Sequence, residues 1–163
     1  MGHSITAIVI RGPADPAALE TYDLRPVALG QGLTLLHIDH YYSAYWQARL
    51  GLRDFLSAPP DAPCIFPLEG VLVTIAAALT GRAAPLFALI QTDYFGGAGS
   101  QWAMAYEGAR ALPGDGMINA ALRHLGVRRR AGIDEFDAVG LGEHRSPPDY
   151  LDRYVDLCDE LGV

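Results

Sequence analysis

The stretch 85–101, PLFALIQTDYFGGAGSQ, joins an apolar run without alternation to a segment that holds three glycines and several polar side chains. A short apolar run of this kind is typical of a central β-strand covered on both faces. Glycine adopts positive φ at little steric cost, so the second segment predicts a sharp turn or a loop with exposed backbone N–H groups. Both interpretations, a structural turn and a binding loop, remain open at this point.

Several further strands are expected around this one. Residues 4–11 are β-branched and apolar on both alternating faces, which predicts a second central strand. Two short extended runs around Gly30-Gln31-Gly32 predict a hairpin, and Glu107-Gly108 is spaced like the turn of another. The expected strands are 4–11, 25–29, 33–39, 85–91, 101–106, 109–112 and 136–141.

Capping residues mark the expected helices. Asp15 and Ser146 precede prolines as N-caps do, Pro67 suits a first helical position, and Gly81 suits a C-terminal stop. Helices are expected at 16–22, 39–56, 68–79, 117–125 and 147–161. Mixed strands and helices without a linker predict one α+β domain over residues 1–163, with helices packed on a mixed β-sheet of about five or six strands.

Composition narrows the function classes. The chain has 163 residues, 50% of them hydrophobic, and a formal net charge of −7. This charge argues against nucleic acid as the main partner, since that affinity comes largely from cations on phosphates. The longest apolar run, 71–79, is too short to span a bilayer. Two cysteines and no basic, apolar leader predict a cytoplasmic protein with reduced thiols and no membrane contact.

The glycine-rich loop is the main candidate for a ligand site. Its backbone N–H groups predict anion binding if they converge, yet the chain has no Lys for a P-loop and the spacing is not G-x-G-x-x-G. Asp93, at a strand end, and Ser100 are the catalytic candidates, although capping of the loop also explains Asp93. The ligand-binding candidates are Asp93, Gly96, Gly97, Gly99, Ser100 and Gln101.

A second group of candidates is the segment 37–46. His37, Asp39 and His40 resemble the start of a metal site that Glu69, Asp93 or His144 would complete. Their spacing matches no metal motif, so we predict neither a bound metal nor a cofactor. The aromatic residues of the segment favour a partner-binding surface, because Tyr and Trp are enriched at binding hot spots. They are Tyr41, Tyr42, Tyr45 and Trp46.

The segments 92–101, 118–127 and 134–142 together resemble a group of small uncharacterised bacterial proteins over roughly the C-terminal half. The resemblance implies accessory or immunity-like roles and transfers no activity. We therefore expect a cytoplasmic, non-catalytic binding protein that acts through a protein partner. The alternative is an enzyme, or a protein that binds a small ligand or anion, using the loop from Asp93 to Gln101.

Overall fold

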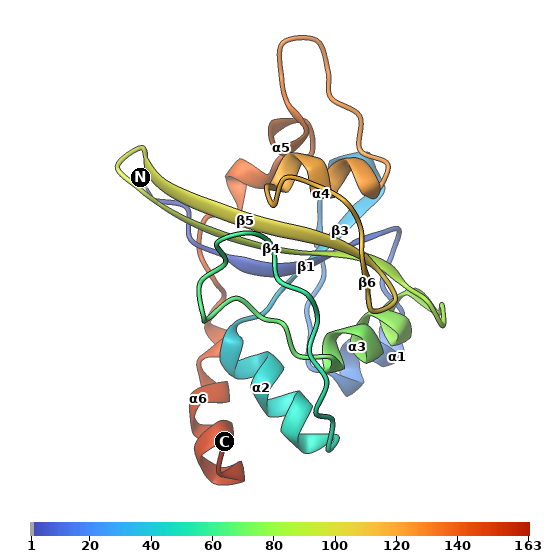
Figure 1. Ribbon diagram of the computed structural model, residues 1–163, viewed down its shortest axis with the longest axis vertical. Coiled ribbons are helices and arrows are strands. Elements are labelled where there is room, and N and C mark those ends of the chain that lie inside the picture. The colour runs from blue at the N-terminus through green and yellow to red at the C-terminus, as the bar shows by residue number, and fades with distance from the viewer. Residues whose placement is uncertain (1) are drawn as a thin grey trace.

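The computed structural model describes residues 2–163 as a six-stranded sheet with helices on both faces (Figure 1). The strand order is β2-β3-β1-β4-β5-β6. The strands are β1 (Thr6–Arg11), β2 (Val27–Ala28), β3 (Leu33–His37), β4 (Leu86–Phe95), β5 (Ala98–Glu107) and β6 (Arg110–Ala111). The helices are α1 (Pro16–Thr21), α2 (His40–Arg49), α3 (Val71–Thr80), α4 (Ile118–His124), α5 (Glu135–Ala138) and α6 (Arg153–Leu161), with short 3-10 turns η1 (Gly30–Gly32), η2 (Leu141–Glu143) and η3 (Asp149–Leu151).

The predicted α+β class and strand number are confirmed, and the strand pairing differs from the expected mixed sheet. Every neighbouring pair is antiparallel. β3 and β4 both flank β1, so the chain between them crosses one face of the sheet through α2 and α3. Because of this pairing, the start of β1 lies beside the end of β3 and the middle of β4, with Thr6 opposite Gln91 and Ala7 opposite His37.

The sheet separates two apolar cores. Ile8, Ile10, Phe87 and Leu89 point towards α1, α2, α3 and α6, whereas Ala7, Val9, Ala88 and Ile90 point towards α4 and α5. Figure 1 shows the two layers of helices on opposite sides of the sheet. The strands β1 and β4 are buried on both faces, which is why their sequences are apolar without alternation.

The glycine-rich segment is a hairpin turn. Thr92–Phe95 continue β4, and Ala98–Gln101 begin β5, so only Gly96-Gly97 connects the strands. Both glycines have positive φ, 63° and 81°, as a two-residue turn of type I′ requires. A Cβ on Gly99 would lie 2.6 Å from the Cα of Tyr94 and still closer to the carbonyl oxygen of Asp93. All three glycines are therefore explained by backbone geometry.

Four expected elements are corrected. The helix expected at 39–56 ends at Arg49, where Gly51 follows with a positive φ of 68°. The strand expected at 136–141 is helical, as α5 and η2, because Asp134 caps α5 by accepting from the Asp137 N–H. The helix expected from Pro67 begins at Val71, and its C-terminal stop at Gly81 is confirmed. Ser146 makes no N-cap, since the chain passes through η3 before α6 begins. None of the helices described is long and apolar enough to cross a membrane.

Candidate functional site

A pocket of about 260 Å³ lies where β1 starts and α2 begins, beside the second half of β4. The loop before α3 and the chain entering α6 complete its wall. Its lining consists of Ser4, Ile5, Thr6, Ile38, Asp39, His40, Ile65, Gln91, Thr92, Asp93, Pro147, Leu151 and Asp152. The pocket thus joins segments that are far apart in the sequence.

Three carboxylates from three different elements line this pocket. Asp39 is the N-cap of α2 and accepts a 2.8 Å hydrogen bond from the Tyr42 N–H. Asp93 projects from β4, and Asp152 immediately precedes α6. Burial raises the pKa of the Asp39 carboxyl; the Tyr42 N–H and the His40 imidazole act in the opposite direction, and the charge of Asp152 raises it further. Asp39 and Asp152 are therefore close enough to repel each other.

The amide of Gln91 also lies in the pocket wall. Gln91 is on the same face of β4 as Asp93, because side chains two residues apart share a face. Its side chain is only 6% exposed, and its Oε1 has no hydrogen-bond partner within residues 2–163. A buried acceptor without a partner costs about 1–3 kcal/mol.

The electrostatics of the pocket favour cations. The N-terminus of α2 faces it and carries roughly half a positive charge. The carboxylates of Asp39, Asp93 and Asp152 outweigh this half charge, and the lining contains no Arg. Binding of an anion in this pocket is therefore unfavourable, because its net charge is negative.

An exposed acidic stripe continues from the pocket along α6. Asp152, Asp156, Asp159 and Glu160 are all exposed and follow the i, i+4, i+7, i+8 spacing of one helix face. Tyr154 and Cys158 occupy the opposite, buried face. The one arginine of the helix, Arg153, is paired with Asp23. The carboxylates of the stripe therefore remain available to solvent.

The predicted ligand residues of the hairpin do not converge on this pocket. Asp93 reaches it, whereas Gln101 lies on the other face, where its Oε1 accepts from the Ile118 N–H at the start of α4. Ser100 is exposed opposite Asp93, and Gly96-Gly97 form the turn. The six residues named as ligand-binding candidates are thus divided between two faces of the sheet.

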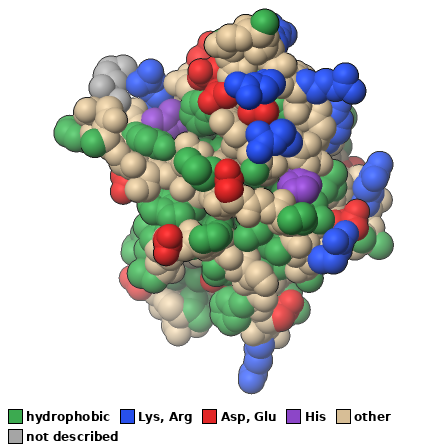
Figure 2. Space-filling model, turned by 45° about the horizontal axis from the view of Figure 1, so that its top comes forward, with side chains coloured by type: hydrophobic (Ala, Val, Ile, Leu, Met, Phe, Trp, Pro, Cys, Tyr) green, Lys and Arg blue, Asp and Glu red, His purple; other side chains and the backbone are tan. Residues whose placement is uncertain are grey.

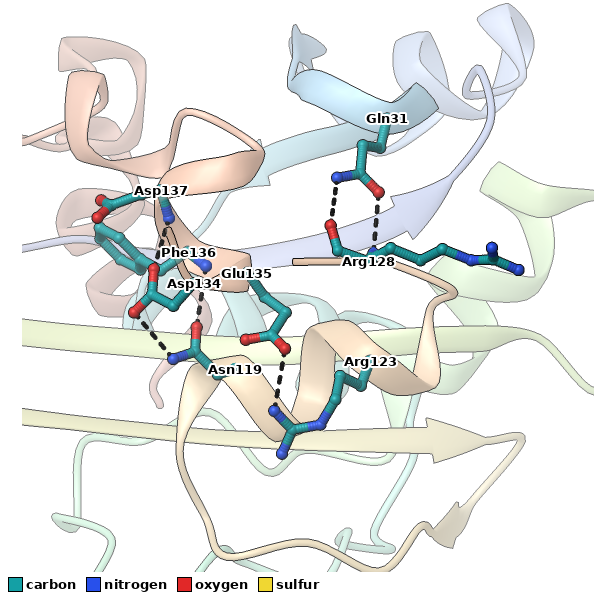
Figure 3. A network of polar contacts seen from close by, with 8 residues as sticks. All are labelled: Gln31, Asn119, Arg123, Arg128, Asp134, Glu135, Phe136 and Asp137. Atoms are coloured by element: carbon teal, nitrogen blue, oxygen red, sulfur yellow. Dashed lines mark hydrogen bonds and ion pairs between the residues drawn. The ribbon is translucent and has the colours of Figure 1, made fainter. Parts of the chain in front are cut away.

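On the face of the sheet that α4 and α5 cover, polar side chains form hydrogen bonds and an ion pair with one another (Figure 3). Asn119 Nδ2 donates to Asp134 Oδ2, and the Phe136 N–H donates to Asn119 Oδ1. Arg123 contacts the buried Glu135 at 3.1 Å. Figure 2 shows Arg and acidic side chains close together on the upper part of the surface. The hydrogen bonds and the ion pair connect α4 to the start of α5 and stabilise their packing.

His37, Asp39 and His40 do not assemble into one site. Asp39 and His40 line the pocket, but the alternation of β3 places the His37 side chain on the opposite face. Among residues 2–163, no group of three or more His, Cys, Asp or Glu side chains is arranged to hold a metal ion. Burial lowers the pKa of His37 from 6.5 to about 4, and the charges of His144 and His3 contribute.

The aromatic candidates mainly form core. Tyr42 is completely buried and donates from its hydroxyl to the Tyr22 carbonyl, so it is unable to contact a partner. Tyr45 and Trp46 are half-buried and pack edge to face, with Tyr154 of α6 against the Tyr45 ring. Tyr41, at 37% exposure, is the most exposed of the four. The expected flat aromatic surface is therefore corrected to a seam between α2 and α6.

Comparisons of the chain with protein-family models, with curated proteins and with solved structures found no match. The function of the candidate site is therefore inferred from its own residues. Sequence reasoning named Asp93 as a ligand-binding candidate and Asp39 as a weak metal-ligand candidate, and it missed Gln91 and Asp152. The signal that was available for Asp152 is the acidic spacing on the exposed face of α6, while Gln91 looked like the end of an apolar strand.

Proposed function

We propose that the protein is a non-catalytic binding protein that holds a basic segment of a protein partner against the acidic pocket and the stripe of α6. The observation that carries this proposal is the convergence of Asp39, Asp93 and Asp152 on one pocket whose lining has no Arg. The raised pKa of Asp39 supports it, because a bound cation would favour the carboxylate and lower that pKa.

The length of the acidic surface supports a protein partner rather than a small cation. Residues 152–160 span roughly 12 Å along a helix that rises 1.5 Å per residue. A basic segment that enters the pocket can continue along this stripe, whereas a small cation would use the pocket alone. The net charge of −7 would also speed encounter with a basic partner at low salt. Both cysteines are free thiols, which supports action in the cytoplasm.

Catalysis has less support from the geometry. The pair most like a nucleophile and base is Thr92 Oγ1 and His3 Nδ1, at 2.8 Å. Thr92 is 1% exposed and also accepts from the Ile5 N–H, while His3 Nε2 contacts the Leu141 carbonyl. These contacts tie β1 and β4 to η2 and give a substrate no access to the hydroxyl.

Binding of a fluorescent basic peptide, measured by anisotropy at low and high salt, tests the proposal. We expect the double variant Asp39→Asn and Asp152→Asn to bind at least tenfold more weakly, because two pocket carboxylates, one of them partly buried, are neutralised. Asn preserves the N-cap of α2, so the fold should persist. The control carries the same charge change, Asp137→Asn with Glu143→Gln, at exposed positions outside the pocket. Equal affinity of the two double variants would refute the site.

A further inference from the structure

The size of the pocket suits one amino-acid side chain. Pockets for drug-sized ligands have volumes of about 300–1,000 Å³, and this one has about 260 Å³. It opens beside the acidic stripe of α6, since Asp152 belongs to both. A single side chain of a segment lying along the stripe is therefore the unit that the pocket can enclose.

The walls combine apolar and acidic groups. Ile38 and Leu151 are almost completely buried beneath the pocket, and Ile65 at its edge is 45% exposed. Apolar walls suit the methylene stem of a long basic side chain, which gains from burial while its charged head keeps polar contacts. Asp39 and Asp93 supply the contacts for the head. The lining thus fits a long amphipathic cation better than a compact ion.

Gln91 adds a neutral acceptor beside the carboxylates. The residue is 94% buried on the pocket face of β4, and its Oε1 has no partner within the described residues. A half-turn of the amide exchanges Oε1 and Nε2, so the acceptor can be presented to an entering N–H group. Gln91 and Asp93 lie two residues apart on the strand, a spacing of roughly 6.6 Å between their Cα atoms.

We propose that this pocket is the arginine-recognition site of the protein, with the guanidinium of a partner arginine donating to Gln91 Oε1 and to the carboxylates of Asp93 and Asp39. The inference rests on the proposed function. A guanidinium has five N–H donors in a fixed plane and is weakly hydrated, so it can bridge separated acceptors at a small desolvation cost. A lysine ammonium is a compact, strongly hydrated charge and loses more hydration on entering.

Two matched peptides test this recognition by calorimetry. Both carry the same lysine-flanked glycine–serine sequence, and they differ only by arginine or lysine at the central position. We expect the wild-type protein to bind the arginine peptide about tenfold more tightly, the difference given by one hydrogen bond to a charged donor. Gln91→Met should remove most of this preference while changing the lysine-peptide affinity less than twofold. Gln91→Glu, which keeps an acceptor, should retain it.

The outcomes separate the two proposals. If the wild-type protein binds both peptides equally and Gln91→Met changes neither affinity, arginine recognition is wrong and the binding function stands. If neither peptide binds at low salt, both proposals fail. Nα-acetyl-arginine amide carries the arginine side chain without the flanking segment. If the protein bound it as tightly as the arginine peptide, the flanking segment would contribute nothing to affinity, and the proposed role of the partner segment would be wrong. The melting temperature of Gln91→Met, expected at or above that of the wild type, confirms that the variant is folded.

Discussion

The acid sensitivity of the fold is expected to come largely from His37. Its side chain is 6% exposed, and its Nδ1 has no hydrogen-bond partner among residues 2–163. Burial, with the charges of His144 and His3, lowers its pKa from 6.5 to about 4. The folded protein therefore holds a neutral imidazole over a pH range in which the unfolded chain takes up a proton.

The direction of the effect follows from this difference in protonation. The contribution of the neutral His37 to stability is fully present above pH 6.5 and is lost as the pH falls towards about 4, because the unfolded state binds more protons in that window. The full shift of 6.5 − 4 = 2.5 units corresponds to about 3 kcal/mol at 1.36 kcal/mol per unit. Only part of the window lies between pH 7 and 5, and water screens part of the effect, so we expect a loss of about 2 kcal/mol there.

Urea denaturation followed by tryptophan fluorescence measures this loss. The variant His37→Phe keeps an aromatic ring but has no titrating group, so its unfolding free energy should change about 2 kcal/mol less between pH 7 and 5 than that of the wild type. His124→Gln, at a more exposed histidine on α4, is the matched control and should behave like the wild type. The reasoning is refuted if His37→Phe loses as much stability as the wild type over this interval.

Two structural predictions accompany this one and use the same denaturation assay. Gly99→Ala should destabilise the fold by about 3 kcal/mol or more, because its Cβ would press on the backbone of Asp93, whereas Gly97→Ala should cost about 1 kcal/mol for positive φ alone. Equal effects would contradict the steric argument. Gln47→Leu should cost about 2–3 kcal/mol, since the Gln47 amide donates to the Asp54 carbonyl and accepts from the Val71 N–H that begins α3. A loss below 1 kcal/mol would show that water replaces these contacts.

Local chemistry made much of the fold readable from the sequence. The apolar runs of β1 and β4 predicted central strands, and Asp15 caps α1 as predicted by accepting from the Ala18 N–H. The segment 136–141 was misread because a short apolar run fits a strand or a helix equally well. In the structure Asp134 caps α5, so this segment is helical. In the sequence, the possible cap and the apolar run were equally strong signals.

The candidate site was only partly readable. The sequence by itself determined an acidic, single-domain α+β chain and marked Asp39 and Asp93 as polar residues at the ends of strands. Only the tertiary structure decided that these two residues meet Asp152 and Gln91, because antiparallel pairing brings the start of β1 beside the end of β3 and the middle of β4. Local residue patterns specify helices, strands and turns, whereas long-range strand pairing and helix packing decide which charges become neighbours.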